Sequence, residues 1–267
     1  QTAQGYELKV YKNNDWVWEK VTVRTKTDLT RRGITDWKQC NTKLIKRGRK
    51  YFLAFAYEKD VKLHKLKEDK TRILSIDLGL TNSAVGCVME SDGTVLDRLL
   101  VKQAKEKDHL FHLVNQLKKA PRQTIGAACP RYWNAIKGLQ KQMTNDTAHQ
   151  IIELAKTYNV NTIVFEYLGK MRVAKGLYGA KRLRFKLHYW LKTAIQNKVE
   201  EMAHYLGMRI SRVLARGTSM YAYDGTGEVV RSDRKDLCKF PGGKQYHADL
   251  NASYNIGARF YIRAIIK

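Results

Sequence analysis

The chain has 267 residues, and 50 Lys and Arg against 25 Asp and Glu give it a formal net charge of +25 at pH 7. Hydrophobic residues make up 43% of the chain, which excludes a disordered basic tail and suffices for one large domain or a domain with a smaller companion. So large a positive surplus indicates a polyanionic partner, and it favours nucleic acid over a ribosome-associated role or an anionic membrane surface.

The first 60 residues predict a β-rich segment. Residues 6–11 and 16–23 alternate polar and apolar side chains, and residues 50–58 are rich in aromatic rings. A basic turn precedes the last of these strands, and we predict that it binds a phosphate backbone, with a merely solvated turn as the alternative. Its residues are Lys46, Arg47, Arg49 and Lys50. A charged linker over 59–72 leads into a second domain, so the predicted domains are 1–60 and 61–267.

The second domain predicts an α/β fold. Apolar strands are expected at 72–80, 83–89, 94–101, 161–168 and 208–215. Helices are expected at 104–119, near 130–158 with a break at Pro130, at 182–207 and from 248 to the end. Three strands in a meander, continued by β-α units, predict an RNase H-like mixed sheet with flanking helices, although this order leaves other α/β folds open. A Gly-rich polar segment over 216–247 interrupts the pattern before the final helix.

Three acidic residues stand at positions where α/β sheets gather functional groups. Asp77 and Glu166 end apolar strands, and Asp249 opens the final helix. Together these carboxylates would repel one another without cations between them, and their hard oxygens suit Mg²⁺ or Mn²⁺. Two such ions can activate water and stabilise the leaving oxygen of a phosphodiester. We therefore predict a catalytic metal site at these residues from their order and placement together, because an acid at such a position taken alone more often serves turn or helix-cap chemistry.

Three segments around these carboxylates carry a resemblance to a known family. SIDLGLTNSAVG (75–86), IVFEYLGK (163–170) and HADLNASYNIGAR (247–259) resemble the three RuvC motifs of TnpB-type transposon-encoded nucleases and type V CRISPR effectors. The resemblance implies metal-dependent, RNA-guided cleavage of DNA, with a guide RNA and target DNA as partners. It places Asp77, Glu166 and Asp249 on the metal-binding carboxylates of the family. It also implies that residues 1–60 form part of a small β-barrel, the wedge-like region that holds RNA.

The sequence departs from the family pattern in two places. Members carry a zinc ribbon with two CxxC pairs, but here the corresponding positions in the degenerate segment 216–247 are Ala222, Gly225, Cys238 and Pro241. One thiol cannot hold a tetrahedral zinc, so we predict no zinc and a segment that RNA, DNA or packing must order. The helical N-terminal recognition lobe is also missing, so we expect a fragment of a longer chain or a reduced form that needs a further protein subunit.

Two more basic clusters are predicted to bind nucleic acid, with solvated side chains as the alternative. They are Lys181, Arg182, Arg184 and Lys186 at the start of a helix, and Arg231 and Arg234 in the loop before the third motif. His247 is expected to form a loop hydrogen bond rather than to assist a metal.

Two other functions fit parts of the sequence. An RNA-guided protein that holds DNA without cutting it would carry the same motifs, although all three acidic residues are retained. Residues 76–88 also resemble the first phosphate motif of actin-like, chaperone-type ATPases, but those proteins need a duplicated second half, for which 267 residues is short.

The pattern of cysteines and the length of the apolar runs indicate the cellular compartment of the protein. Four scattered cysteines without a CxxC pair are typical of a reducing environment, and we expect the cytoplasm or nucleoid of a prokaryote. No run of about 18 apolar residues predicts a transmembrane helix, so no membrane partner is expected.

Overall fold

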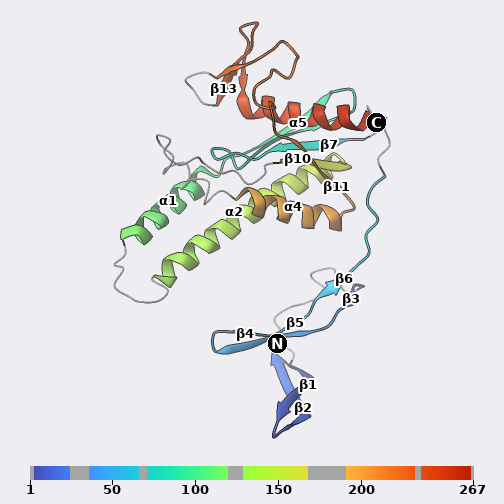
Figure 1. Ribbon diagram of the computed structural model, residues 1–267, viewed down its shortest axis with the longest axis vertical. Helices are drawn as coiled ribbons and strands as arrows, with labels where there is room; N and C mark the ends of the chain where they lie inside the picture. The colour runs from blue at the N-terminus through green and yellow to red at the C-terminus, as the bar shows by residue number, and fades with distance from the viewer. Residues whose placement is uncertain are drawn as a thin grey trace. The chain divides into compact units, whose positions relative to one another are not determined.

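A computed structural model of the chain describes residues 3–24, 36–65, 71–119, 129–167, 191–231 and 236–265. These residues divide into two compact units, Gln1–Asp60 and Val61–Lys267 (Figure 1). Each unit pairs its own strands, and no sheet of the described residues combines strands from both.

The first unit consists of antiparallel strand pairs. β1 (Ala3–Lys12) and β2 (Asp15–Arg24) form a long hairpin, in which the turn residues Asn13 and Asn14 have φ of 53° and 65°. A tight two-residue hairpin turn requires this left-handed region, which asparagine tolerates better than most residues. The other pairs are β3 (Lys38–Gln39) with β6 (Tyr57–Glu58) and β4 (Lys43–Arg47) with β5 (Lys50–Ala54). The predicted strands of this segment are therefore present, as two-stranded pairs.

The second unit contains a five-stranded mixed sheet with the strand order β11-β10-β7-β8-β9. Its strands are β7 (Ile73–Asp77), β8 (Ala84–Met89), β9 (Val95–Val101), β10 (Thr162–Tyr167) and β11 (Arg209–Leu214). β7, β10 and β11 run parallel, whereas β8 and β9 continue from β7 as an antiparallel meander. The observed order is the meander followed by parallel β-α units that the sequence predicts.

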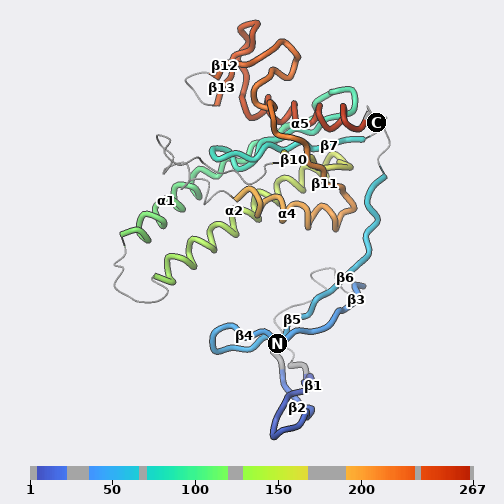
Figure 2. The backbone as a smooth tube through the Cα atoms, in the orientation of Figure 1, coloured from blue at the N-terminus to red at the C-terminus, as the bar shows by residue number. Residues whose placement is uncertain are grey.

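Helices cover both faces of this sheet (Figures 1 and 2). α2 (Pro130–Thr157) and α4 (Lys192–Tyr205) lie on one face, and α5 (Ala248–Ile265) lies on the other. α1 (Ala104–Lys119) packs against α2 rather than against the sheet. The sheet is therefore the middle of three layers, which keeps the central strands away from water.

The sheet has an apolar core on each of its two faces, and the alternation of side chains along β7 contributes to both. Leu74 and Ile76 point toward α2 and α4, whereas Ile73 points toward α5, and all three are fully buried. α5 approaches the sheet closely at Gly257, where an added Cβ would lie 3.0 Å from the sulfur of Met89. A side chain at this position would require the Met89 side chain to shift by a few tenths of an ångström.

Two helices begin differently from the sequence-based expectation. The predicted break at Pro130 is wrong, because this proline lies in the first turn of α2, where its missing N–H leaves no helical bond unmade. The preceding Cys129 has a φ of 62°, so the chain turns sharply into the helix. α4 begins at Lys192, and residues 182–190 of the predicted helix lie outside the described residues.

The segment between β11 and α5 has a small sheet of its own. Its antiparallel strands are β12 (Val230–Arg231), β13 (Leu237–Lys239) and β14 (Gln245–His247). β14 leads directly into α5, so this sheet lies next to the first turn of that helix. The segment predicted as a degenerate insertion is therefore folded in its described part, and we call it the insertion below.

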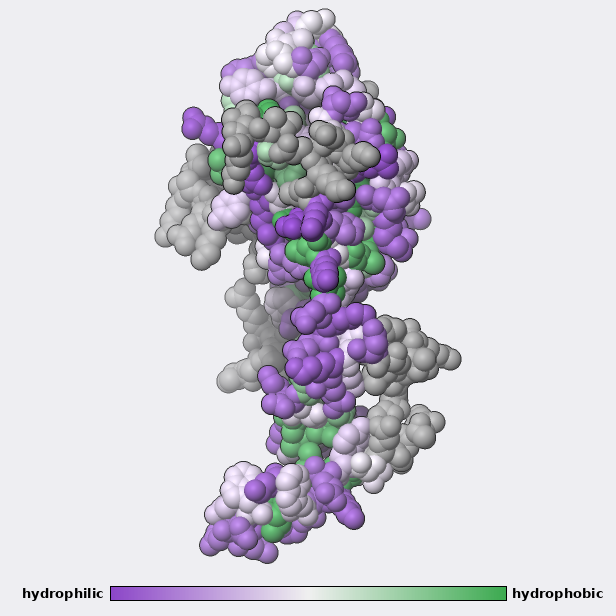
Figure 3. Space-filling model, turned by 90° about the vertical axis from the view of Figure 1, so that its right-hand side faces the viewer, coloured by the Kyte–Doolittle hydropathy of each residue, from purple (hydrophilic) through white to green (hydrophobic). Residues whose placement is uncertain are grey.

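Hydrophilic side chains dominate the face of the molecule that Figure 3 shows, and hydrophobic ones appear there only in smaller areas. This distribution agrees with a net charge of +25, because charged side chains remain in water unless they are paired. Among the described helices, none is long and apolar enough to span a membrane.

Candidate active site

Asp77 and Glu166 lie at the same edge of the central sheet. β7 and β10 are neighbouring parallel strands with Ile76 opposite Phe165, so the next residue on each strand reaches the carboxyl-terminal edge. Asp249 lies in the first turn of α5. The charges of Glu166 and Asp249 both act on Asp77, so the structure brings the three predicted carboxylates into one neighbourhood.

Burial and repulsion change the proton affinity of Asp77. Burial is the main cause that raises its pKa to about 8, and the negative charges of Glu166 and Asp249 act in the same direction. The positive charge of Arg231 opposes them. An ionised Asp77 is therefore unfavourable here unless further positive charge is added.

Glu166 is restrained by neighbouring polar groups. The hydroxyl of Thr218 donates a hydrogen bond to Oε1 of Glu166, and both residues are buried, with 2% and 8% of their surface exposed. Gln196 Nε2 donates to the main-chain oxygen of Glu166 at 3.3 Å. Burial raises the pKa of Glu166, whereas the bond from Thr218 and the charge of Arg259 lower it. The carboxylate thus has a fixed orientation and a partly compensated charge.

Asp249 is held by the loop that follows β7. Asn82 Nδ2 donates a hydrogen bond of 2.7 Å to Oδ2 of Asp249. The loop is tight, since an added Cβ at Gly79 would lie 3.0 Å from the carbonyl oxygen of Asn82. Lys107 Nζ donates to the carbonyl of Thr81 at 2.6 Å, and burial lowers the pKa of this amine to about 8. The first and third motifs are therefore joined through an asparagine side chain.

One face of α5 carries three polar side chains that we call the α5 clamp, namely Asn251, Asn255 and Arg259. Their spacing of four residues places them above one another on the helix. All three contact main-chain atoms of residues 214–223, the segment that follows β11. Arg259 Nη1, for example, donates to the carbonyl of Leu214 at 2.6 Å.

The two asparagines hold the turn that contains Thr218. Asn251 Nδ2 donates to the carbonyl of Tyr221 at 2.9 Å, and its Oδ1 accepts from the N–H of Tyr223 at 2.9 Å. Asn255 Nδ2 lies 2.9 Å from the carbonyl of Thr218 and 2.7 Å from that of Tyr221. The helix that carries Asp249 therefore also fixes the residue that restrains Glu166.

The donor chemistry of the site fits a hard divalent cation. Three carboxylates supply oxygen ligands of the kind that Mg²⁺ and Mn²⁺ prefer, and a bound cation would favour the ionised form of Asp77, which burial and the two neighbouring acids disfavour. In the part of the chain that the structure describes, no three acidic, histidine or cysteine side chains are already arranged around one point as metal ligands. The three carboxylates therefore share a neighbourhood without converging on a single point.

The predicted basic turn is the β4–β5 hairpin of the first unit. Its turn begins at Gly48, which has a φ of 61°. Lys46 lies 5.5 Å from the ring centroid of Tyr51, and Arg47 lies 5.9 Å from that of Phe52. The four predicted residues are all exposed, namely Lys46, Arg47, Arg49 and Lys50. The structure thus brings these four together on one exposed hairpin.

The other predicted basic residues are only partly described. Arg231 is exposed on β12, and it lies near enough to Asp77 for its charge to lower the pKa of that carboxyl. Five predicted residues lie outside the described residues, namely Lys181, Arg182, Arg184, Lys186 and Arg234. His247 Nδ1 accepts a hydrogen bond of 3.4 Å from the N–H of Leu250, in agreement with the predicted loop hydrogen bond.

Two of the four positions that correspond to the family's zinc ligands pack together instead. Ala222 and Cys238 are buried side by side in an apolar cluster with Phe240 and Ala248. Gly225 has a φ of 77°, which closes the turn after Ala222. These side chains offer a single thiol and do not fit a tetrahedral zinc site. The sequence left open whether RNA, DNA or packing orders this segment, and in the described part of the insertion packing does so.

Aromatic rings extend this small core. The ring of Tyr223 lies 4.9 Å from that of Tyr254, 5.4 Å from that of Tyr246 and 5.6 Å from that of Phe240. Lys244 Nζ lies 4.9 Å from the Tyr223 centroid and donates to its hydroxyl oxygen at 2.9 Å. Such ring–ring and cation–ring contacts each add to the stability that burial provides.

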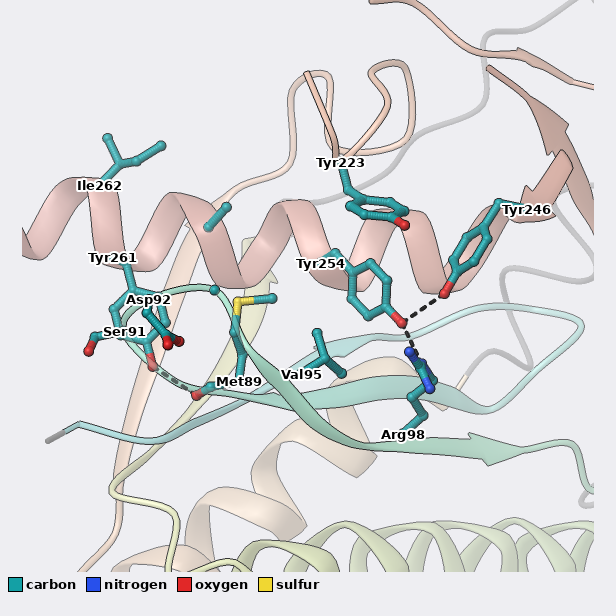
Figure 4. A pocket seen from close by; sticks show the side chains of 12 residues that line it. Met89, Ser91, Asp92, Val95, Arg98, Tyr223, Tyr246, Tyr254, Tyr261 and Ile262 are labelled. Carbon is teal, nitrogen blue, oxygen red and sulfur yellow. Dashed lines mark hydrogen bonds between the residues drawn. The ribbon is translucent and has the colours of Figure 1, made fainter. Parts of the chain in front are cut away.

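A pocket of about 410 Å³ lies beside these rings, between the β8–β9 turn, α5 and the insertion (Figure 4). In it the hydroxyl of Tyr254 lies 2.9 Å from that of Tyr246 and accepts a bond from Arg98 Nε. The hydroxyl of Tyr261 donates to the carbonyl of Met89 at 2.8 Å. The three carboxylates do not line this pocket, and its tyrosines belong mainly to the packing of the insertion on α5.

The residues that hold the carboxylates in place were not predicted from the sequence. Asn251 and Asn255 stand within the third motif, and their four-residue spacing on a predicted helix was a usable signal. Asn82 follows Asp77 within the first motif, but nothing in the sequence pairs it with Asp249. Thr218 and Lys107 carry no local signal, because their contacts arise only from the fold.

Comparisons with known proteins agree with the motif resemblance. No family model matches the chain. In sequence, it is similar to a TnpB-like protein of Aquifex aeolicus (strain VF5), with 27% identity over 239 residues that cover 80% of this chain and 76% of the relative. In structure, it is similar to Cas12f1 in a complex with sgRNA and target DNA, with a TM-score of 0.53 and 16% identity. That match covers 95% of this chain and 65% of the Cas12f1 chain.

The likeness to Cas12f1 shows the fold. The RNase H-like mixed sheet with flanking helices that the sequence predicts is therefore confirmed. The chain spans slightly under two thirds of the length of that solved chain. In sequence it is similar to a TnpB-like protein, and in fold to a type V CRISPR effector, as its three RuvC-like motifs predict.

Proposed function

We propose that the chain is an RNA-guided DNA endonuclease, or the nuclease part of one, with Asp77, Glu166 and Asp249 as its metal-binding catalytic residues. The observation that carries this proposal is the gathering of the three carboxylates at one sheet edge, where burial and their charges raise the pKa of Asp77. A buried acidic group of this kind calls for compensating cations. The TnpB-like relative supports the nuclease family, and the net charge of +25 supports a nucleic-acid substrate.

The chain's own residues prepare the carboxylates for this role. Thr218 orients Glu166, and Asn82 orients Asp249, so two of the three proposed ligands are fixed by neutral hydrogen-bond donors. Neutral donors restrain a carboxylate without neutralising the charge that attracts a cation. When bound, Mg²⁺ or Mn²⁺ would lower the pKa of a water and stabilise the leaving oxygen of the phosphodiester.

Exposed basic residues would hold the nucleic acid. The β4–β5 hairpin in the first unit offers four positive charges, and Arg231 offers one near Asp77. We also assign this role to the predicted residues outside the described part of the chain, namely Lys181, Arg182, Arg184, Lys186 and Arg234. Guide RNA and target DNA are the proposed partners, together with a recognition lobe or subunit that would place the target.

The test starts with the RNA. The gene is expressed with its flanking DNA, the protein is purified, and the RNA that copurifies is sequenced. A single abundant, structured RNA with a variable end is expected, and a DNA that matches this end should be cut only when Mg²⁺ or Mn²⁺ is present. The Asp77→Asn variant should cut at least about 100-fold more slowly, because ligand loss removes several kcal/mol of transition-state stabilisation.

Asp108→Asn is the matched control, because Asp108 is an exposed acid on α1 whose charge is not among those that shift the pKa of Asp77. It should cut at the parent rate, and both variants should bind the RNA as the parent does. Cutting by Asp77→Asn at the parent rate would show that the site is assigned wrongly. RNA-dependent binding of DNA without cutting would favour the DNA-binding alternative.

A further inference from the structure

The outer face of the β1–β2 hairpin carries three exposed aromatic rings. Tyr11, Trp16 and Trp18 have 62%, 58% and 66% of their surface exposed. Tyr11 lies directly opposite Trp16 in the strand register, and their ring centroids are 5.5 Å apart. Large rings gathered on a solvent-facing surface are unusual and mark an interaction site more often than chance.

The core of the first unit does not account for these rings. Side chains alternate along both strands, and the half-buried ones all lie on the opposite face, which includes Leu8, Val10 and Val17. On that face Tyr6 contacts the ring of Phe55, with centroids 5.4 Å apart. The inner face thus serves the packing of the unit, and the outer face is left for another partner.

Positive charge lies among the rings. Lys9 is opposite Trp18 on the outer face, and Lys20 follows Trp18 on the same side of β2. Lys20 is 88% exposed and lies 4.0 Å from Glu7, a separation that leaves its charge largely to solvent. Exposed rings interleaved with lysines match the two features that hold single-stranded nucleic acid, stacking platforms and charge along the backbone.

We propose that this outer face, formed by Lys9, Tyr11, Trp16, Trp18 and Lys20, binds unpaired bases of a single-stranded nucleic acid by stacking. Residues two apart on a strand are about 7 Å apart, so Trp16 and Trp18 can each meet a different base of one strand. A duplex hides the faces of its bases, so it is not the expected ligand. The inference goes beyond the basic residues proposed above to hold nucleic acid, because it assigns the stacking of bases to other residues of the first unit and requires no cleavage.

The test measures binding of short oligonucleotides to the full chain in EDTA, which keeps cleavage out of the measurement. An end-labelled thymidine oligonucleotide of about 12 nucleotides, near the usual span of such sites, is compared with an abasic strand of the same length and with a blunt duplex. The Trp16→Leu/Trp18→Leu variant removes the aromatic faces and keeps apolar side chains of moderate size. It should bind the thymidine strand at least about tenfold more weakly, and the abasic strand as the parent does.

Two further variants sharpen the test. Trp16→Phe/Trp18→Phe should retain much of the affinity, because it retains rings that can stack. Phe111→Leu, an exposed ring on α1 of the other unit, should bind the thymidine strand as the parent does. The far-ultraviolet spectrum and melting temperature of the Leu variant should match those of the parent, because the two tryptophans are exposed.

The proposal is overturned if the Leu variant binds the thymidine strand as the parent does, or if the parent binds the abasic strand equally well. It is also overturned if the parent self-associates and the Leu variant does not, since the face would then join two copies of the chain. None of these outcomes bears on the carboxylates. Conversely, loss of cutting in Asp77→Asn should leave oligonucleotide binding unchanged, so the two proposals fail independently.

Discussion

Each of two carboxylates in the candidate site depends on one neutral residue for its orientation. Thr218 donates to Glu166, and Asn82 donates to Asp249, whereas the main influence on Asp77 is burial. The donors come from distant parts of the chain and meet the acids only in the folded state. At this scale the site is therefore testable by substitutions that preserve size and remove one hydrogen bond.

Thr218→Val should slow cutting by about tenfold or more, because a hydrogen bond to a charged group contributes roughly 1.5–3 kcal/mol. Val keeps the shape of the side chain, and Thr218→Ser keeps the hydroxyl, so the Ser variant should restore most of the rate. The measurement is the cutting rate over a range of Mg²⁺ concentrations, since a loosened Glu166 should also weaken metal binding. Equal rates for the Val and Ser variants would show that the hydroxyl has no role.

The metal-free protein should lose stability as the pH rises from about 4 to about 8. Asp77 has a raised pKa of about 8 in the fold, whereas an unfolded carboxyl titrates near 3.9, so the folded state holds the extra proton between these values. The stability that this proton provides is complete below about pH 4 and is lost as the pH passes through 8. Denaturant unfolding in EDTA measures the free energy of unfolding of the parent and of Asp77→Asn, and the difference between these two values should narrow toward pH 4. A constant gap between them would contradict the raised pKa.

At the scale of elements, α5 joins the third carboxylate to the insertion. Asp249 lies in its first turn, and Asn251 and Asn255 on the same helix hold the turn that carries Thr218. The insertion is in turn ordered by its own apolar cluster around Phe240. These two supports, the clamp and the cluster, can be removed separately.

Asn251→Ala should lower the free energy of unfolding by about 1–3 kcal/mol, because it leaves the partly buried N–H of Tyr223 without its side-chain acceptor and removes one of the two side-chain donors to the carbonyl of Tyr221. It should also slow cutting, since the turn that carries Thr218 loses its anchor. Denaturant unfolding and the cutting rate measure the two effects. Asn134→Ala, at an exposed position on α2, is the matched control and should change neither.

Phe240→Ala should destabilise the insertion by about 3–5 kcal/mol, the usual effect of removing a buried aromatic side chain. Limited proteolysis, read by cleavage within residues 216–247, measures this loss locally. A zinc chelator should leave the proteolysis of the parent unchanged, because packing orders the described part of the insertion. If the chelator alone exposed the segment, a metal would have to be assigned to it.

The sequence predicted the elements of this fold better than the contacts between them. The strands that end at Asp77 and Glu166 were evident from short apolar runs, and the final helix from its opening Asp249. Local pattern could not predict that Pro130 starts a helix rather than breaks one, because both outcomes use the same residue. The pairing of Thr218 with Glu166 spans 52 residues and depends on the loop after β11, so no spacing rule could supply it.

At the scale of the whole molecule, the charge of +25 should dominate the affinity for nucleic acid. Binding should therefore weaken steeply with salt, because each phosphate that is neutralised releases counterions. A variant with Lys46, Arg47, Arg49 and Lys50 replaced by Gln should reduce the slope of log K against log salt by about 3. Titrations of guide RNA at several salt concentrations measure this slope, and an unchanged slope would remove the β4–β5 hairpin from the binding surface.

The α5 clamp has one property that bears on how this chain can change over time. Its side chains grip only carbonyl oxygens and an N–H of residues 214–223, so they are indifferent to which side chains those residues carry. Side chains of this stretch that make no contacts of their own can therefore vary while the backbone path past Glu166 stays the same, whereas Thr218, Ala222 and Tyr223 are held by the contacts described above. Exposed residues such as Met220 can thus be replaced while Thr218 keeps its place beside Glu166.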